Sequence, residues 1–390
     1  MSAGAATAFT ESAERQELRK AVAALGAEFG GDYLQDCARN GRKTTELWDR
    51  AGQLGYLGVA IGEAYGGGGG DIGDLAAVCE ELAAQGSPML LMVVSPAICG
   101  TIIEKFGTEE QRQHWLPGFA DGSTKMAFGI TEPDAGSNSH ELSTAVRRDG
   151  DDWILNGGKY YISGVDEASH VLVVARHTDA AGNRGLPSVF IVPTDAPGLT
   201  AQMIEMDIVS PEKQFTLFFD DVRLPADAIV GDPDAGLSQI FAGLNPERIM
   251  AASFATGLGR FALDKATDYA RTRNVWGTPI GAHQGIAHPL AHAAISLELA
   301  RVMTQKAAAM YTAGAKGAGE AANMAKYAAA EAACAVIDQA VQVHGGNGLA
   351  AEYGLGALLG ASRVMRIAPV SREMILNYVS THTLGLPRSY

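Results

Sequence analysis

The first third of the chain carries hydrophobic residues at the spacing of an α-helix. Four of them fall on one face because they are three or four positions apart: Leu18, Val22, Leu25 and Phe29. The same periodicity predicts further helices over residues 45–54, 75–85 and 109–119. The N-terminal region is therefore expected to be helical.

Two segments of this region need separate interpretation. The hydrophobic stretch 89–99 contains Pro96 and is too short to span a bilayer, so we expect a buried helix there. The glycine run 66–70 is followed by Asp71 and not by the Lys-Ser/Thr pair that a phosphate-binding loop requires. We interpret it as a connecting loop.

The pattern changes near Lys125. Five segments rich in β-branched and aromatic residues predict strands over 126–131, 153–163, 170–176, 188–193 and 214–225. The pairs Asp149-Gly150 and Asn156-Gly157 predict hairpin turns. Because no helical pattern lies between the strands, we expect an antiparallel sheet and not a Rossmann fold, and no G-x-G-x-x-G follows a strand.

Helical periodicity returns after residue 235. It predicts helices over 247–269, 292–313, 320–344 and 371–384. The fold class is thus α+β, with an N-terminal helical domain, a middle antiparallel β-barrel or sandwich and a C-terminal four-helix bundle. We place the domains at 1–123, 124–234 and 235–390.

Composition narrows the possible functions. With 390 residues, 47% of them hydrophobic, the chain can bury a large core. A net charge of −14 disfavours binding to nucleic acid or an anionic membrane. The four cysteines are scattered, and the first 16 residues lack the basic and apolar regions of a signal peptide, so we expect a cytoplasmic protein.

Three segments resemble the signatures of the acyl-CoA dehydrogenase family. They are GITEPDAGSNSHEL (129–142), NGGKYYISG (156–164) and the stretch 342–371, which begins QVHGGNG. Asn138, Tyr161 and Ser163 stand where the family usually has Asp, Trp and Thr. RTRNVWG (271–277) and HQGIAHPLA (283–291) are similar to the family's dinucleotide contacts.

The resemblance spans nearly the whole chain and implies FAD as cofactor. Arg273 would bind the FAD pyrophosphate, and the Gly345-Gly346 pair would approach the FAD of a neighbouring subunit. The FAD-binding residues that it implies are Phe128, Ile130, Thr131, Gly136, Ser137, Tyr161, Ile162, Ser163, Arg273, Trp276, Gln284, Gln342, Val343, Gly345, Gly346, Ser371 and Glu373. The implied substrate contacts are Ser137, Arg248, Pro369 and Val370.

The family chemistry requires a carboxylate that removes the α-proton of an acyl-CoA while flavin N5 takes hydride from Cβ, giving a trans-2-enoyl-CoA. Medium-chain members carry this Glu in an Ile-Tyr-Glu-Gly-Thr run, where this chain has Ile-Ala-Pro-Val-Ser and so Pro369. Isovaleryl and long-chain members place it before an Arg, which matches Glu247-Arg248 in LNPERI. We therefore predict Glu247 as the base, with a raised pKa.

The alternative for Glu247 is structural. Pro246 could mark the first turn of a helix, where an acidic residue favours the helix dipole. A further departure from the family is that Pro369 lacks the N–H that helps to polarise the thioester carbonyl. Either Val370 or the flavin ribityl hydroxyl would then contribute more, or the local backbone would be shifted.

The resemblance also implies partners, namely an acyl-CoA substrate, an electron-transferring flavoprotein and a homotetrameric or dimeric assembly. Two alternatives keep the fold: an enoyl-thioester reductase or carrier-protein-dependent dehydrogenase, and a catalytically silent flavoprotein. The base position favours branched or bulky acyl chains, and the pocket floor would include Met89, Leu91 and Met92.

We assign no metal-binding or catalytic role to the histidines His288, His292 and His344. His288 and His292 are four residues apart, but Pro289 lies between them and no carboxylate does, so we interpret them as core or interface residues and expect no metal. His344 precedes Gly345-Gly346, where we expect a packing or FAD-adjacent role. No G-x-S-x-G is present, which disfavours a serine hydrolase.

The FAD prediction can be checked on the purified protein. It should be yellow, with about one FAD per subunit, because the signatures contact one dinucleotide per chain. Absorbance spectroscopy and the mass of the released cofactor measure this. A colourless protein that FAD cannot reconstitute would contradict the resemblance.

Overall fold

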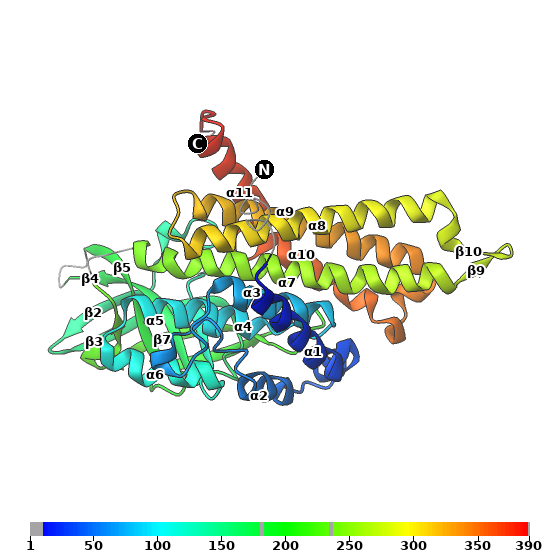
Figure 1. The fold of residues 1–390 in the computed structure, drawn as a ribbon. Helices are drawn as coiled ribbons and strands as arrows, with labels where there is room; N and C mark the ends of the chain where they lie inside the picture. Colours follow the sequence, from blue (N-terminus) through cyan, green and yellow to red (C-terminus); the bar gives the residue numbers. More distant parts are fainter. Residues whose placement is uncertain (1–10, 180–182, 234–236, 389–390) are drawn as a thin grey trace.

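The structure, a computed structural model, describes residues 11–388 except 180–182 and 234–236. Most of the segment in which we looked for a signal peptide, the border predicted between 234 and 235, and the last two tail residues lie outside the described residues. Figure 1 shows long helices packed along one side of a body formed by the sheet and the N-terminal helices. The predicted domain borders stay predictions.

The N-terminal region is helical, as its periodicity predicts. Its helices are α1 (Ala13–Arg39), α2 (Thr45–Gln53), α3 (Ile72–Ala84), α4 (Leu90–Val94), α5 (Thr101–Phe106) and α6 (Glu109–Asp121). The stretch 89–99 is buried and helical, but a π-helical segment, Ser95–Gly100, follows α4 at Pro96. Proline has no N–H for the α-helical ladder, which explains the change of helix type.

The glycine run 66–70 is a loop, as predicted, and leads into the cap of α3. An added Cβ at Gly67 would lie 2.2 Å from the carbonyl oxygen of Ile61, so only glycine fits there. Asp71 then accepts hydrogen bonds from the N–H groups of Gly73 and Asp74, which completes a capping box. The run therefore serves a close backbone contact.

The middle region is an eight-stranded sheet in the order β6-β7-β3-β2-β4-β5-β8, with β1 beside β4. Its strands are β1 (Met126–Gly129), β2 (Ala145–Asp149), β3 (Asp152–Ser163), β4 (His170–Thr178), β5 (Arg184–Pro193), β6 (Leu199–Ile204), β7 (Gln214–Leu224) and β8 (Ile229–Val230). Most pairs are antiparallel, but β1 and β2 both run parallel to β4. The prediction of a wholly antiparallel sheet was wrong, because non-local returns of the chain can pair strands in parallel without a crossover helix.

Of the two predicted turns, Asp149-Gly150 is confirmed and Asn156-Gly157 is wrong. The first joins β2 to β3, with Gly150 at φ +64°. The second lies inside β3, where the pairing with β7 shifts register between Leu155 and Gly157. An added Cβ at Gly157 would lie 2.7 Å from Thr144 Cα, so this glycine serves a bulge and a close backbone approach.

The C-terminal region is a helical bundle. Its helices are α7 (Leu237–Thr272), α8 (Gln284–Thr312), α9 (Ala318–His344), α10 (Leu355–Ile367) and α11 (Arg372–Tyr378), and a short hairpin of β9 (Asn274–Val275) and β10 (Thr278–Pro279) precedes α8. Helix α10 was not predicted. Small residues let the long helices approach closely, among them the fully buried Ala262, Ala266, Ala325 and Ala329.

Helix α7 corrects one of the two interpretations of Glu247. Pro246 lies inside this 36-residue helix and does not begin it. Glu247 is therefore about three turns from the first described residue of α7, beyond the turn in which the helix dipole favours an acid. The structural alternative based on a first-turn position was wrong.

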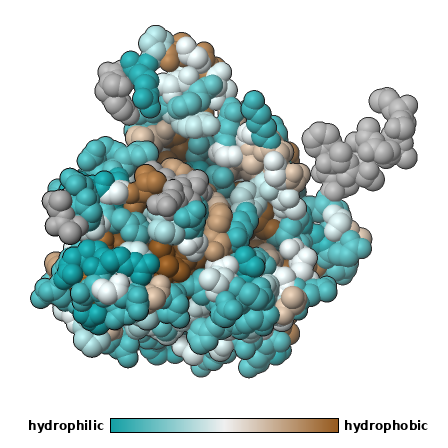
Figure 2. Space-filling view, turned by 90° about the vertical axis from the view of Figure 1, so that its left-hand side faces the viewer, coloured by the Kyte–Doolittle hydropathy of each residue, from teal (hydrophilic) through white to brown (hydrophobic). Residues whose placement is uncertain are grey.

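Among the described residues, no helix has the length and apolar character needed to cross a membrane. Figure 2 shows the face at the left of Figure 1: hydrophilic residues cover most of it, and hydrophobic residues gather toward its centre.

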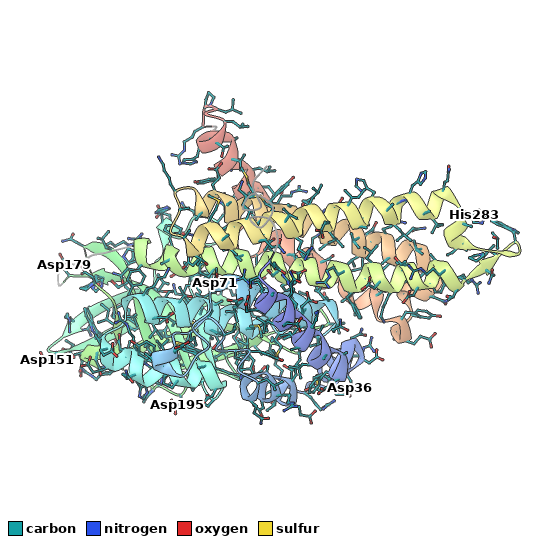
Figure 3. All side chains as sticks on the ribbon, viewed as in Figure 1. Asp36, Asp71, Asp151, Asp179, Asp195 and His283 are labelled. Carbon is teal, nitrogen blue, oxygen red and sulfur yellow. The ribbon has the colours of Figure 1, made fainter. Side chains whose placement is uncertain are left out.

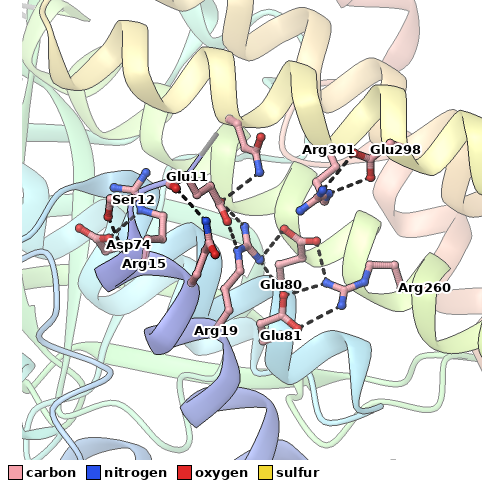
Figure 4. A network of polar contacts seen from close by, with 12 residues as sticks. Glu11, Ser12, Arg15, Arg19, Asp74, Glu80, Glu81, Arg260, Glu298 and Arg301 are labelled. Carbon is pink, nitrogen blue, oxygen red and sulfur yellow. Dashed lines mark hydrogen bonds and ion pairs between the residues drawn. The ribbon is translucent and has the colours of Figure 1, made fainter. Parts of the chain in front are cut away.

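A network of charged side chains joins the N-terminal region to the bundle (Figure 4). Arg19 of α1 pairs with Glu81 of α3 at 2.7 Å, and Arg260 of α7 pairs with the same residue at 2.8 Å. Glu80 lies within 3.0 Å of both arginines and Glu11 pairs with Arg19. The side chains of Glu80 and Glu81 are only 3% and 7% exposed, so water screens these pairs weakly.

Glu81→Gln should therefore destabilise the protein. Loss of a buried ionic partner costs about 3–5 kcal/mol, and the lower end is expected because Glu80 and Glu11 still neutralise the arginines. Burial raises the pKa of Glu81, but Arg260 and Arg19 outweigh this and lower it, so the contribution is present at neutral pH and is lost as the pH falls below the ordinary carboxyl range.

Urea denaturation of the wild type and the variant at pH 7 and pH 4 measures this difference. Glu17→Gln is the matched control, because Glu17 forms an exposed i,i+3 pair with Lys20 and should change stability by no more than about 0.5 kcal/mol. Equal stability of the Glu81 variant and this control would contradict the role of the network.

Candidate active site

Glu247 extends from α7 into a region where three parts of the chain meet. Its charge acts on Cys99 of the π-helical segment, and the charge of Lys326 on α9 acts on it. Burial raises the pKa of Glu247 to about 7, although the positive charges of Arg248 and Lys326 oppose this shift. Part of its surface stays accessible. The result is a carboxyl group that can both hold and release a proton near neutral pH.

The segment before α11 lies at the same end of the bundle. The Lys326 ammonium donates a hydrogen bond of 2.6 Å to the carbonyl oxygen of Val370 and also interacts with Glu373. Ser371 caps α11 by accepting a bond from the N–H of Met374. Lys326 thus links Val370 and Glu373 to the surroundings of Glu247, and the roles of Pro369, Val370, Ser371 and Glu373 stay predictions.

Arg248 lies beside Glu247 and has spare hydrogen-bonding capacity. One terminal nitrogen donates to Asn245 Oδ1 at 2.8 Å, whereas the buried Nε has no partner in the described part of the chain. Burial also lowers the pKa of this guanidinium. A ligand oxygen at this position would satisfy the free N–H.

The predicted residues around β1 face this region from the sheet. Phe128 belongs to the same hydrophobic cluster as Cys99 and Ile240 of α7, and Ile130 packs against it. The N–H of Tyr160 donates to the carbonyl oxygen of Thr131 at 2.8 Å, which places the end of the β1 segment against β3.

A buried ion pair fixes the loop that follows. Lys159 of β3 lies 2.7 Å from Glu132 and also donates to the carbonyl oxygen of Ile130 at 3.1 Å. Burial alone would raise the pKa of Glu132, but the Lys159 charge and hydrogen bonds from Ser143 and Thr144 lower it to about 2. Burial lowers the pKa of Lys159 to about 8, so both groups are charged at neutral pH. Gly136 and Ser137 are exposed at this loop.

The Tyr161-Ile162-Ser163 run presents alternate faces. Tyr161 is 50% exposed, whereas Ile162 is 2% exposed and belongs to the sheet core. Ser163 donates to Gln214 at 2.9 Å. The next residue, Gly164, contacts Leu91, because an added Cβ there would lie 2.5 Å from a Leu91 methyl group.

Leu91 of the predicted pocket floor therefore adjoins the predicted flavin-contacting run. Met89 and Met92 are also almost wholly buried. The role of all three in acyl binding stays a prediction.

The remaining predicted FAD residues lie at the opposite end of α7. Arg273, Trp276 and Gln284 are exposed there, and Figure 3 labels His283, their neighbour in sequence, at the tip of the α7–α8 pair. Trp276 is 91% exposed. In the described part of the chain, the Arg273 guanidinium makes no hydrogen bond or ion pair.

The Gly345-Gly346 pair lies at the same end of α7 as Arg273, which we call the far end. His344 stacks on Tyr269 of α7 at 4.2 Å, and Asn347 donates to the Tyr269 hydroxyl. This confirms a packing role for His344. Added Cβ atoms at Gly345 and Gly346 would meet nothing within 4 Å, so the backbone there is open to a ligand. Gln342 is exposed beside them and Val343 is buried.

Within a single chain, the residues around Glu247 lie far from those around Arg273 and Gly345-Gly346. Twenty-five residues of helix separate Glu247 from Thr272, a rise of about 37 Å. The structure therefore brings together the residues of each end but not the two ends.

His288 and His292 do not belong to the core, because both are exposed on α8. Their other predicted location, an interface, is not tested by a single chain. No cluster of three or more metal-binding side chains occurs among the described residues.

Sequence reasoning missed Lys326 and the pairing of Glu132 with Lys159. A signal for Lys326 was present, since it is a lone lysine among Ala322, Ala325 and Ala329 on the buried face of α9. The Glu132–Lys159 pair gave none, because the partners are 27 residues apart and pair through the sheet fold.

The far end suits one half of a dinucleotide. Open glycine backbone, an arginine without a partner among the described residues and an exposed aromatic ring are groups that bind phosphate and stack on a base. At the other end, Glu247 has a raised pKa and its charge acts on Cys99, which shares a hydrophobic cluster with Phe128 of β1. Together they define a candidate flavin-dependent enzyme.

Comparisons with known proteins agree with this class. Family models match the acyl-CoA dehydrogenase N-terminal domain at residues 12–123, the middle domain at 127–222 and the C-terminal domain at 234–384. The acyl-CoA dehydrogenase FadE12 of Mycobacterium tuberculosis is 61% identical over 98% of this chain and 99% of its own length.

Two solved structures are also similar. Butyryl-CoA dehydrogenase from Megasphaera elsdenii has a TM-score of 0.90 and 27% identity, covering 96% of this chain and 99% of its own. A glutaryl-CoA dehydrogenase from Mycobacterium smegmatis in complex with FADH2 has a TM-score of 0.89 and 27% identity, covering 97% of each chain.

The chain belongs to the acyl-CoA dehydrogenase family. It is an oxidoreductase that acts on acyl-CoA, and FAD is its cofactor.

The carboxyl of Glu247 should titrate near pH 7, because burial favours its neutral form. Difference infrared spectroscopy of the FAD-loaded protein between pH 5 and 9 should show a protonated-carboxyl band that disappears with rising pH. The band should be missing in Glu247→Gln. A carboxyl that is already fully ionised at pH 5 would contradict the buried environment.

Proposed function

We propose that Glu247 is the base that removes the α-proton of the acyl-CoA. The observation that carries the proposal is a carboxyl with a pKa near neutrality that interacts with Lys326, the same lysine that is bonded to Val370. In the 369–371 segment, proline occupies the place of the base in medium-chain members. A base works best when its pKa is close to the working pH. No other carboxyl is needed for the step.

Activation of the α-proton requires hydrogen bonds to the thioester carbonyl. Pro369 has no N–H, whereas the N–H of Val370 donates no hydrogen bond in the described part of the chain. We assign Val370 as the protein donor to the carbonyl, with the ribityl hydroxyl of FAD as the second, and Arg248 as a substrate contact. When bound, FAD would supply the acceptor for the hydride that leaves Cβ.

The flavin site is completed by a second copy of the chain. FAD is too short to span about 37 Å of helix, so Arg273, Trp276, Gln284 and Gly345-Gly346 would serve the FAD held by a partner. Large hydrophobic residues on α8 support such an assembly: Ile295, Leu299 and Val302 are 60%, 68% and 42% exposed at helical spacing. We infer a homotetramer or dimer that passes electrons to an electron-transferring flavoprotein in the cytoplasm.

The test is Glu247→Gln, which keeps the shape of the side chain but cannot accept the proton. The variant should retain FAD and acyl-CoA binding and reduce flavin at least ~10²-fold more slowly. Anaerobic stopped-flow bleaching with butyryl-, isovaleryl-, octanoyl- and palmitoyl-CoA measures the rate and reports the chain preference, with an acyl-carrier-protein thioester as a separate arm.

Glu298→Gln is the matched control, because Glu298 is an exposed partner of Arg301 and should leave the rate unchanged. Near-normal bleaching by the Glu247 variant would place the base elsewhere. Failure of every substrate to bleach the wild type would refute the proposed reaction.

A further inference from the structure

Lys326 is a buried lysine that the family chemistry does not require. It is 2% exposed, and the neighbouring positions on its helix face are Ala322, Ala325 and Ala329. Transfer of an ammonium group from water to such surroundings is costly unless partners compensate. The partners of Lys326 therefore indicate what this charge does.

Two kinds of partner surround it. The carbonyl oxygen of Val370 accepts a hydrogen bond of 2.6 Å, the one hydrogen bond of this ammonium in the described part of the chain. Glu247 heads the charged groups that act on Lys326, followed by Cys334, Glu331 and Glu373. Glu247 in turn is acted on by two positive charges, those of Arg248 and Lys326.

Glu331 is engaged elsewhere. It pairs with Arg366 at 2.9 Å, and Arg372 lies 3.7 Å from it. Glu373 is exposed and pairs with Arg372. In the described part of the chain, Glu247 has no ion-pair or hydrogen-bond partner of its own. Lys326 is the buried cation that both acts on Glu247 and donates to the 368–371 segment.

We propose that Lys326 is a positioning residue for Glu247: it anchors the carbonyl of Val370 to α9 and keeps the Glu247 carboxyl ionised within reach of the substrate. The inference rests on the proposed function of Glu247. The same ammonium serves both tasks, because its hydrogen bond orients it toward the segment that would hold the thioester while its charge acts on the base.

The sign of the effect distinguishes this role from simple packing. Removal of a nearby positive charge disfavours the ionised carboxylate, so the pKa of Glu247 should rise. The rate of flavin reduction should then fall at neutral pH and recover at high pH. Loss of packing alone would lower the rate equally at all pH values.

Three substitutions separate the two tasks. Lys326→Met removes charge and donor, Lys326→Gln keeps a donor for Val370 without charge, and Lys326→Arg keeps both. In stopped-flow bleaching with the best acyl-CoA of the panel, the pH midpoint should rise by about one unit in the Met and Gln variants, which lowers the rate about tenfold at pH 6. The Arg variant should keep a midpoint close to that of the wild type.

A second readout does not depend on turnover. The infrared carboxyl band assigned to Glu247 in the FAD-loaded enzyme without acyl-CoA should shift its titration midpoint upward in Lys326→Met and Lys326→Gln. Lys125→Met is the control, since Lys125 is a partly buried lysine paired with Glu167 and should leave both midpoints unchanged. If Lys326→Met loses FAD or does not fold, the Gln and Arg variants carry the comparison.

The outcomes separate this inference from the proposed function. Fast flavin reduction by Glu247→Gln would show that Glu247 is not the base. A slow Glu247→Gln variant together with unchanged midpoints in every charge-free Lys326 variant would leave the base in place and overturn the role of Lys326.

Discussion

The continuity of α7 is the constraint on which the rest of the molecule depends. This helix runs through Pro246 without interruption and contributes to the N-terminal core, the bundle and the charge network with α1 and α3. Because a helix is stiff along its axis, it fixes Glu247 at one end and the Arg273 hairpin at the other. A bundle built on such a helix therefore carries the two groups of predicted site residues at opposite ends.

The sheet supplies the other side of the candidate site, and a buried charge pair holds it in place. Glu132 and Lys159 would be costly to bury singly, yet each neutralises the other and further hydrogen bonds complete the carboxylate. Their pairing fixes the end of β1 against β3. The loop that carries Gly136 and Ser137 can therefore be exposed while the residues from which it extends are held in place.

Glu247 shows the opposite arrangement. Burial raises its pKa, no hydrogen bond or ion pair reaches it from the described residues, and the charges of Arg248 and Lys326 oppose the shift. A structural carboxylate such as Glu132 is stabilised in its charged form, whereas a base must be able to change its charge. The contrast between the two glutamates follows from the close Lys159 charge and the hydrogen bonds that Glu132 accepts, against the desolvation that dominates at Glu247.

The sequence by itself determined the order of helical and β regions, because hydrophobic periodicity reports which face of each element is buried. It also predicts Glu247 as the base, since Pro369 removes the carboxyl from the alternative position. Only the tertiary structure decided the parallel pairs of β4, the bulge at Gly157 and the position of Pro246 within α7, because these depend on which distant segments lie alongside. The same holds for Lys326 and for the Glu132–Lys159 pair: burial and charge compensation are properties of neighbours in space, which a single linear pattern does not contain.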